Sequence, residues 1–216
     1  MTRVKVCGIK EEAHARAVAR AGGDFIGLVF APSGRQITPE RARDIASVVR
    51  ENNKIAVVGV FVNTPAAEVN RIADYCHLDW VQLSGDEPWE HCRQIARPVI
   101  KAVWIGWESP EEIVAHLTKG EKALSGKKHL YLVDSCVKGK YGGSGVAFDW
   151  GRAQPVAEHF PVIIAGGLNA HNVAQAIRIV SPWGVDVSSG VEVDGVKDEA
   201  KIKAFIEAVR RSDDRQ

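Results

Sequence analysis

Short apolar runs rich in Val and Ile alternate with longer stretches of helical period along the whole chain. Such runs are typical of buried strands, whereas apolar residues spaced three and four positions apart indicate amphipathic helices. The predicted strands are residues 3–7, 24–30, 55–62, 80–83, 99–104, 129–133, 162–165 and 184–188. The predicted helices are residues 11–21, a segment that starts at Pro39, a segment from Pro65 to about Tyr75, and residues 87–95, 110–117, 150–159, 172–180 and 197–211.

Turn and capping residues support several of these helix ends. Gly22-Gly23 follows the first helical segment, as expected where a helix ends in the left-handed conformation. Thr38-Pro39 and Thr64-Pro65 each place a threonine, a good N-cap, before a proline, which suits the first helical position. We therefore expect helices to start at both Thr-Pro pairs.

Eight strands that are each followed by a helix predict parallel pairing through right-handed crossovers. The chain of 216 residues allows about 27 residues for each unit, which suits a closed (βα)8 TIM barrel. A doubly wound open sheet is the alternative, but it usually has fewer strands, and the first strand here lacks a GxGxxG dinucleotide loop. No linker, low-complexity run or charge block divides the chain, so we expect residues 1–216 to form a single TIM-barrel domain of the α/β class.

Charge and cysteine usage exclude several classes of function. The chain has 28 Lys and Arg against 27 Asp and Glu, a net charge of +1, and 45% of its residues are hydrophobic. This balance argues against a nucleic-acid-binding protein and against a disordered chain. The cysteines, Cys7, Cys76, Cys92 and Cys136, form no CxxC pair, and the N-terminus lacks an apolar signal segment. We expect a cytoplasmic protein with neither a nucleic-acid nor a membrane partner.

Charged residues also occur inside the predicted strands. By strand alternation Lys5 shares a face with Cys7. Lys5, Lys101 and Asp186 are expected to meet inside the barrel, because an unpaired buried charge costs several kcal/mol. Chemistry in this fold takes place at the C-terminal strand ends. We therefore interpret the three as a scaffold network at the barrel base.

Glycine clusters stand at three strand-to-helix junctions in the last third of the chain. They are Gly142-Gly143-Ser144-Gly145, Gly166-Gly167 and Ser188-Ser189-Gly190. Glycine lets backbone N–H groups approach an anion closely, and a following helix N-terminus adds a favourable dipole. One such cluster usually serves only a turn. Three of them, two in the loops after strands seven and eight where barrels commonly bind phosphate, favour a phosphorylated small molecule as the ligand.

A thiol, a carboxyl and a guanidinium fall at the same predicted rim. Cys7 ends the first strand, Asp134 ends the sixth, and Arg35 lies in the loop after the second. A thiol and a carboxyl that face one cavity can act as base and acid, and arginine can bind a carboxylate through two parallel hydrogen bonds. The ordinary alternatives are an inert core cysteine and a solvated arginine. The seven histidines form no HExxH or similar ligand set, so no metal is expected.

Seven segments carry a resemblance that runs in order over nearly the whole chain. They are Val4-Lys-Val-Cys-Gly-Ile9, Ile26-Gly-Leu-Val-Phe30, Val58-Gly-Val-Phe-Val62, Val81-Gln-Leu83, Lys140-Tyr-Gly-Gly-Ser-Gly145 with Phe148-Asp-Trp150, Ala165-Gly-Gly-Leu-Asn169 and Val185-Asp-Val-Ser-Ser-Gly-Val191. With these segments the chain resembles the phosphoribosylanthranilate isomerase family of tryptophan biosynthesis. Other phosphate-binding barrels share the glycine segments. The Cys-Gly-Ile start and the Tyr-Gly-Gly-Ser-Gly plus Phe-Asp-Trp combination are the specific ones.

The resemblance implies an Amadori rearrangement of N-(5-phosphoribosyl)anthranilate to 1-(2-carboxyphenylamino)-1-deoxyribulose 5-phosphate. Carried over by position, Asp134 would be the general acid that protonates the furanose ring oxygen, and Cys7, as a thiolate, would remove the proton from C2′. Arg35 would bind the anthranilate carboxylate, and the three Gly/Ser loops would bind the phosphate. The resemblance implies no metal or organic cofactor. The sequence leaves open whether the protein is a monomer or a homodimer.

The chain departs from the family at two places, and two alternatives stay open. Many relatives carry His where this chain has Ser84, which puts a role for that imidazole in doubt, and Ile9-Lys10-Glu11 stands where relatives often have Thr-Asn. Another sugar-phosphate isomerase or epimerase on the same barrel is the first alternative. Cys7 argues against it, because the related enzyme of histidine biosynthesis normally has an acidic residue there. The second is a non-catalytic phosphate-binding barrel, against which the presence of both acid and base argues.

Overall fold

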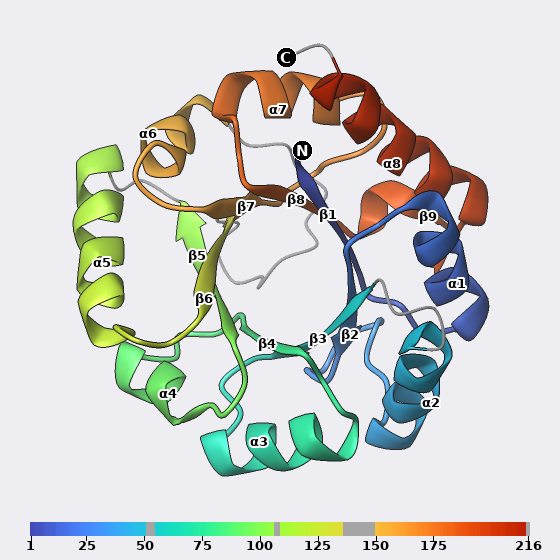
Figure 1. The fold of residues 1–216 in the computed structure, drawn as a ribbon, viewed down its shortest axis with the longest axis horizontal. Coiled ribbons are helices and arrows are strands. Elements are labelled where there is room, and N and C mark those ends of the chain that lie inside the picture. The colour runs from blue at the N-terminus through green and yellow to red at the C-terminus, as the bar shows by residue number, and fades with distance from the viewer. Residues whose placement is uncertain (51–54, 106–108, 136–149, 215–216) are drawn as a thin grey trace.

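The computed structural model describes residues 1–50, 55–105, 109–135 and 150–214. Eight parallel strands close into a barrel in which each strand pairs with its neighbours in chain order, and β8 pairs with β1. Figure 1 shows this ring of strands with the helices around its outside. The predicted barrel is therefore confirmed over the open sheet. The strands are β1 Arg3–Cys7, β2 Phe25–Val29, β3 Ala56–Phe61, β4 Trp80–Leu83, β5 Val99–Ile105, β6 His129–Ser135, β7 Val162–Ile164 and β8 Gly184–Val187.

A helix follows each strand, as the apolar spacing predicts, but one predicted helix is divided, and the helix after β5 ends at Ala123, six residues beyond its predicted end at residue 117. The segment predicted as a single helix over residues 150–159 is a 3-10 turn, η1 (Trp150–Arg152), followed by a short helix, α6 (Gln154–Ala157). Pro155 lies at the start of α6, where its missing N–H does no harm, so the helix restarts there. The other helices are α1 Glu12–Ala21, α2 Pro39–Arg50, α3 Ala66–Tyr75, α4 Trp89–Gln94, α5 Pro110–Ala123, α7 Val173–Val180 and α8 Glu199–Asp213.

Two of the three predicted helix-end signals hold. Gly22 has a φ of 84°, and its N–H donates to the carbonyl of Ala19, which closes α1. Thr38 caps α2, because its Oγ1 accepts from the backbone N–H of Arg41 at 3.3 Å. The prediction for Thr64 is wrong. Its Oγ1 donates to the carbonyl of Val62 instead, and α3 starts only after Pro65, at Ala66.

An unpredicted hairpin stands between β8 and α8. A short turn, η2 (Ser189–Val191), leads into two antiparallel strands, β9 (Glu192–Val193) and β10 (Val196–Lys197). Asp194 and Gly195 connect them with φ values of 50° and 79°, the left-handed pair that a type I′ turn requires. The last helix therefore begins at Glu199 and not at residue 197.

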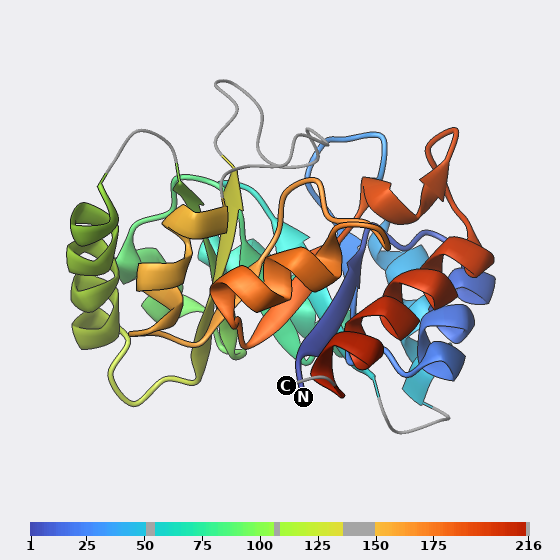
Figure 2. The ribbon, with the colours of Figure 1, turned by 90° about the horizontal axis from the view of Figure 1, so that it is seen from above.

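The barrel has one open end and one end closed by aromatic packing. In Figure 2 the hairpin rises on the side opposite to the chain termini. Near those termini the Thr2 N–H and Oγ1 donate to the Asp213 carboxylate at 3.0 and 2.7 Å, which ties the two ends together. At that end Phe25 packs edge-on against Trp80 inside the ring, with ring centroids 6.3 Å apart. The apolar interior of the barrel consists of Phe25, Val58, Trp80, Ile100, Ala102, Leu130, Leu132, Ile163 and Ala165.

The predicted network of three buried charges is corrected by the structure. Lys5 and Asp186 are register partners in β1 and β8, and Lys5 Nζ donates to Asp186 Oδ1 at 2.9 Å. Lys101 does not join them. Its two neighbours along β5 face the barrel interior, so alternation points Lys101 outward to the helices, where it pairs with Glu87 at 2.7 Å.

Candidate active site

A cavity of about 320 Å³ opens at the C-terminal end of the barrel strands. Its size suits a small ligand, and its place is the usual site of chemistry in this fold. Seven residues predicted from the sequence to belong to the site line it. They are Cys7, Arg35, Asp134, Gly166, Gly167, Ser188 and Ser189.

Gly190 is the one other predicted residue within the described part of the chain, and it is not among the residues that line the cavity. A Cβ on Gly190 would lie 1.9 Å from the carbonyl oxygen of Leu168, so this glycine allows the turn after β8 to pass close to the loop after β7. Gly143, Ser144 and Gly145 lie outside the described residues. Their predicted role toward a phosphate stays a prediction.

Cys7 reaches the cavity from the last position of β1. It is 9% exposed, and its carbonyl oxygen accepts a hydrogen bond from Ser188 Oγ at 3.1 Å. Gly27 is its register partner in β2. A Cβ on Gly27 would lie 2.8 Å from the Cys7 sulfur and 3.2 Å from Lys5 Nζ. The absence of a side chain at residue 27 thus makes room for the sulfur beside the ammonium.

Burial of Cys7 acts on its pKa together with charges of both signs, and the Asp186 carboxylate adds to the effect of burial while the two nearby cations oppose it. Burial raises the pKa of the Cys7 thiol, while the positive charges of Lys5 and Lys197 act to lower it. Burial also acts to lower the pKa of Lys5, but the Asp186 carboxylate and the Cys7 sulfur outweigh it, so this pKa is raised. Burial in turn raises the pKa of Asp186, which Lys5 opposes. A protonated Lys5 therefore stands ready to stabilise a thiolate at Cys7.

Asp134 enters the same cavity from another wall. It lies near the end of β6, opposite Trp104 of β5, and is 7% exposed. Around the ring, β7 and β8 separate its strand from the strand of Cys7. A ligand bound in the cavity therefore lies between a thiol and a carboxyl that approach from different strands.

The loop after β7 brings two glycines to the cavity wall in backbone conformations that favour glycine. Gly166 and Gly167 both have positive φ values, 88° and 62°, which residues with a side chain rarely adopt. Asn172 fixes this loop, because its Nδ2 donates to the carbonyl of Gly167 at 2.9 Å and its Oδ1 accepts from the N–H of Asn169 at 2.8 Å. The two glycines are thus held in place at the cavity wall.

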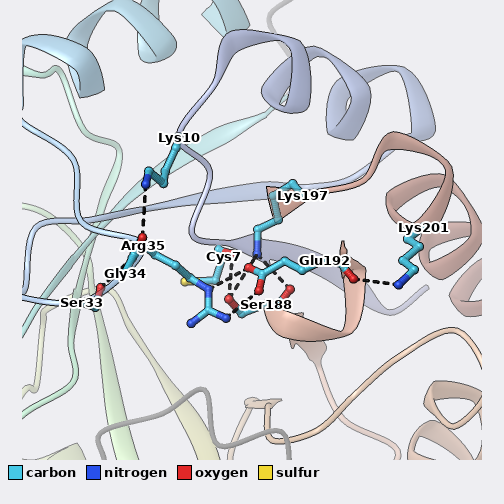
Figure 3. A network of polar contacts seen from close by, with 9 residues as sticks. All are labelled: Cys7, Lys10, Ser33, Gly34, Arg35, Ser188, Glu192, Lys197 and Lys201. Carbon is cyan, nitrogen blue, oxygen red and sulfur yellow. Dashed lines mark hydrogen bonds and ion pairs between the residues drawn. The ribbon is translucent and has the colours of Figure 1, made fainter. Parts of the chain in front are cut away.

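Arg35 is held by Glu192, and Glu192 in turn is held by Lys197; the sequence predicted neither residue. Its Nε and Nη2 donate to Glu192 Oε1 and Oε2 at 2.8 and 2.7 Å. Lys197 Nζ donates to Glu192 Oε1 at 2.6 Å and to the carbonyl of Ser188 at 2.9 Å. Figure 3 shows Glu192 between the two cations, next to Cys7. The Asp-Gly dipeptide at Asp194 is the signal that could have predicted the hairpin that carries both residues.

Ser84, where the family resemblance leads us to expect a histidine in many relatives, directly follows β4. Ser84 lines the cavity, and its Oγ accepts a hydrogen bond from Gln82 Nε2 at 3.0 Å. The serine is therefore part of the site and shares a polar wall with Gln82. The small Ser84 side chain leaves more space in the cavity than a histidine at this position would leave.

A closed parallel barrel with a cavity at its C-terminal end, lined by a thiol, a carboxyl and a glycine loop, defines the class of the protein, that of the TIM-barrel enzymes. The family profile for N-(5'-phosphoribosyl)anthranilate (PRA) isomerase matches residues 4–208. The chain belongs to this family of isomerases. Among the described residues, no three His, Cys, Asp or Glu side chains gather as metal ligands, and no helix there has the length and apolar character to cross a bilayer.

Individual relatives match over nearly the full length of the chain. It is 48% identical to the N-(5'-phosphoribosyl)anthranilate isomerase of Dehalococcoides mccartyi over 215 residues, 99% of this chain and 98% of the relative. The solved phosphoribosyl anthranilate isomerase of Thermotoga maritima is 38% identical, with a TM-score of 0.85 over 98% of this chain and all of that one. A phosphoribosyl anthranilate isomerase solved with reduced 1-(o-carboxyphenylamino)-1-deoxyribulose 5-phosphate is also 38% identical, with a TM-score of 0.82 over the same shares.

Proposed function

We propose that this protein converts N-(5'-phosphoribosyl)anthranilate to 1-(2-carboxyphenylamino)-1-deoxyribulose 5-phosphate in tryptophan biosynthesis, as one catalytic domain. Membership of the isomerase family supports the activity. The observation that carries the mechanism is the presence of Cys7 and Asp134 in one cavity with the glycine loop after β7. The reaction needs an acid, a base and a grip on two anionic groups.

In the first step Asp134 gives a proton to the furanose ring oxygen. The bond between that oxygen and C1′ breaks, and the electron pair on the anilino nitrogen forms a protonated Schiff base at C1′. The carboxyl suits this step because it faces the cavity from a wall separate from that of Cys7. The ring is thereby opened with the nitrogen still attached.

In the second step Cys7, as a thiolate, removes the proton from C2′. The electrons of that C–H bond form the C1′–C2′ double bond of an enolamine, which neutralises the cationic nitrogen. The enolamine then gains a proton at C1′ and loses the proton of its C2′ hydroxyl, which gives the ketone. No atom is lost or gained, as an isomerisation requires.

The substrate would be anchored at both of its anionic ends. The loop with Gly166 and Gly167 and the turn with Ser188 and Ser189 would hold the phosphate through backbone N–H groups. Arg35 would hold the anthranilate carboxylate from the opposite loop. Fixing both ends brings the reacting carbons between acid and base, which removes much of the entropic cost of the reaction.

The decisive experiment follows the loss of anthranilate fluorescence when the purified protein meets freshly prepared substrate. Wild type should turn the substrate over, and Cys7→Ala and Asp134→Asn should each lose at least about a thousandfold in kcat, since each removes a general acid or base. Cys92→Ala is the matched control, because Cys92 is a buried cysteine away from the cavity. Full turnover by Cys7→Ala would contradict the mechanism.

The same preparation separates the alternatives. Binding of a reduced product analogue without any turnover of substrate would favour a non-catalytic barrel. Turnover of a different sugar phosphate in a substrate panel would favour another isomerase. We expect a cytoplasmic monomer or homodimer without nucleic-acid or membrane partners, and sedimentation velocity of the purified chain measures the oligomeric state.

A further inference from the structure

The guanidinium of Arg35 uses only part of its hydrogen-bonding capacity on Glu192. Arginine has five N–H donors, and the bidentate contact occupies one on Nε and one on Nη2. Of the other three, one on Nη1 and one on Nη2 form a second, parallel fork at the tip of the guanidinium. Arg35 lines the cavity and 27% of its side chain is exposed, so a carboxylate in the cavity can reach that second fork.

The aliphatic part of the Arg35 side chain is fixed as well as its guanidinium. Gly8 follows Cys7 directly and has a φ of 81°. A Cβ on Gly8 would lie 2.5 Å from Arg35 Cδ. The aliphatic carbons of Arg35 can therefore pack against residue 8 only because it is glycine. The base and the guanidinium are therefore placed relative to each other by two adjacent residues of β1 and its loop.

The carboxylate that holds Arg35 is itself anchored independently of the arginine. The carbonyl of Glu192 accepts from Lys201 Nζ at 2.7 Å, and its side chain accepts from Lys197 (Figure 3). Burial alone would raise the pKa of Glu192, but hydrogen bonds from Arg35 and Lys197 lower it to about 2. Glu192 is thus an anion at neutral pH, and two lysines fix its place on the hairpin.

A single carboxylate would cancel the charge of Arg35 and weaken its attraction for a second one. Lys197 offsets this, because it places a second cation on the same carboxylate at 2.6 Å. Its side chain is 2% exposed, so solvent screens this charge little. The three side chains together keep a net positive charge at the cavity wall.

We propose that Glu192 is a positioning residue that orients Arg35 toward the substrate's carboxylate, and that Lys197 supplies the charge that keeps this arrangement attractive to an anion. The proposal rests on the proposed function, since it takes the carboxylate of the anthranilate ring as the ligand of Arg35. It predicts that the hairpin after β8 sets specificity for a carboxylated ring.

Two ligands test the proposal: the reduced product analogue, and the same molecule without the ring carboxylate. Dissociation constants are measured by calorimetry for wild type, Glu192→Gln and Glu199→Gln. Glu199 is the matched control, because it also pairs with an arginine, Arg20, but on the exposed surface. Glu192→Gln should raise the dissociation constant of the carboxylated ligand about tenfold. The dissociation constant of the other ligand should stay unchanged, because only the ring carboxylate binds the oriented guanidinium of Arg35. Glu199→Gln should affect neither ligand.

Each other outcome contradicts the proposal. An equal loss of affinity for both ligands would show that Glu192 has only a structural role. Tighter binding of the carboxylated ligand would show that Glu192 competes with the ligand for Arg35. If Glu192→Gln fails to fold by circular dichroism, Glu192→Asp replaces it and should show the same selective loss, because the shorter side chain moves the carboxylate away from the two donors of Arg35. Absence of turnover by wild type would contradict the proposed function itself, whereas normal turnover with unselective losses would contradict only the role of Glu192.

Discussion

Two buried lysine–carboxylate pairs lie on opposite faces of the barrel wall. Lys5 pairs with Asp186 at 2.9 Å inside the ring, and Lys101 pairs with Glu87 at 2.7 Å between the strands and the helices. The lysine side chains are 1% and 7% exposed, so both pairs are equally withdrawn from water. Their difference is in what else each pair contacts.

The outer pair holds loops together. Glu87 accepts from the backbone N–H of Asn63 at 2.8 Å and of Gly85 at 2.9 Å, and Lys101 also donates to the carbonyl of Gly85 at 2.7 Å. The loops after β3 and β4 are therefore joined to β5 through one carboxylate. All these partners belong to the framework, so this pair is structural.

The inner pair faces reacting groups. Asp186 lines the cavity, and the positive charge of Lys5 acts to lower the pKa of the Cys7 thiol. The comparison teaches that burial and pairing alone do not distinguish a structural charge from a functional one. The face of the strand and the neighbour at the end of that strand decide it.

The largest expected effect is on stability at the outer pair. Lys101→Met leaves the Glu87 carboxylate buried without its cation, so we expect the free energy of unfolding to fall by about 3–5 kcal/mol. The kcat of the folded variant should stay close to wild type. Urea unfolding followed by fluorescence measures the first quantity, and the substrate assay measures the second. A large loss of kcat in folded Lys101→Met would remove the distinction between the pairs.

At the inner pair the main loss should be in activity. Lys5→Met removes the cation beside the Cys7 sulfur, and kcat/KM at neutral pH should fall about a hundredfold because less thiolate forms. Stability should fall less than for Lys101→Met, since burial already raises the pKa of Asp186 and a proton can neutralise it. An unchanged kcat/KM would show that Lys5 is as structural as Lys101.

The pH dependence sharpens the role of Lys5. The pKa of Cys7 is raised by burial, so the thiol predominates at neutral pH and thiolate increases as the pH rises. The rate of Cys7 alkylation by iodoacetamide should therefore increase from pH 6 to pH 9, and Lys5→Met should move the profile to higher pH because it removes a charge that favours thiolate. Lys101→Met should leave the profile in place. Mass spectrometry of the modified peptide assigns the reaction to Cys7.

The smallest effect is expected from crowding the inner pair without removing a charge. A Cβ on Gly27 would lie 2.8 Å from the Cys7 sulfur, so Gly27→Ala should displace the thiol and lower kcat by about tenfold. Overpacking of this kind costs about 1–3 kcal/mol of stability. Gly34→Ala offers a control for stability, because a Cβ there meets nothing within 4 Å and Gly34 is not among the glycines with a positive φ. Wild-type kcat in Gly27→Ala would mean that the sulfur position tolerates displacement.

The sequence predicts the fold far better than it predicts the faces of individual strands. The bounds of β1 and β4 agree with the predicted strands, because apolar runs between turn residues define strand extent. The side of Lys101 was not predictable in the same way. A barrel strand is buried on both faces, so apolar residues flank Lys101 on either side and the alternation does not reveal which side is inside.

The sequence predicted the site residues that lie at the C-terminal ends of strands, where this fold carries its chemistry. Cys7 and Asp134 lie at strand ends, and the structure places both at one cavity. Glu192 and Lys197 lie on strands of two residues each, too short for any hydrophobic period to appear. Their contribution depends on a turn that folds back over β8, which is a tertiary arrangement without a periodic signature.

The tie between Thr2 and Asp213 has a consequence for engineering. Because the chain ends meet on the face away from the cavity (Figure 2), a short linker between them would turn the barrel into a continuous ring in which no strand is first. New ends could then be cut on that same face, in the loops that lead from a helix into the next strand. A circular permutant of this kind keeps all eight C-terminal strand ends at the cavity. The order of the strand–helix units in the sequence can therefore change without changing the residues that surround the cavity.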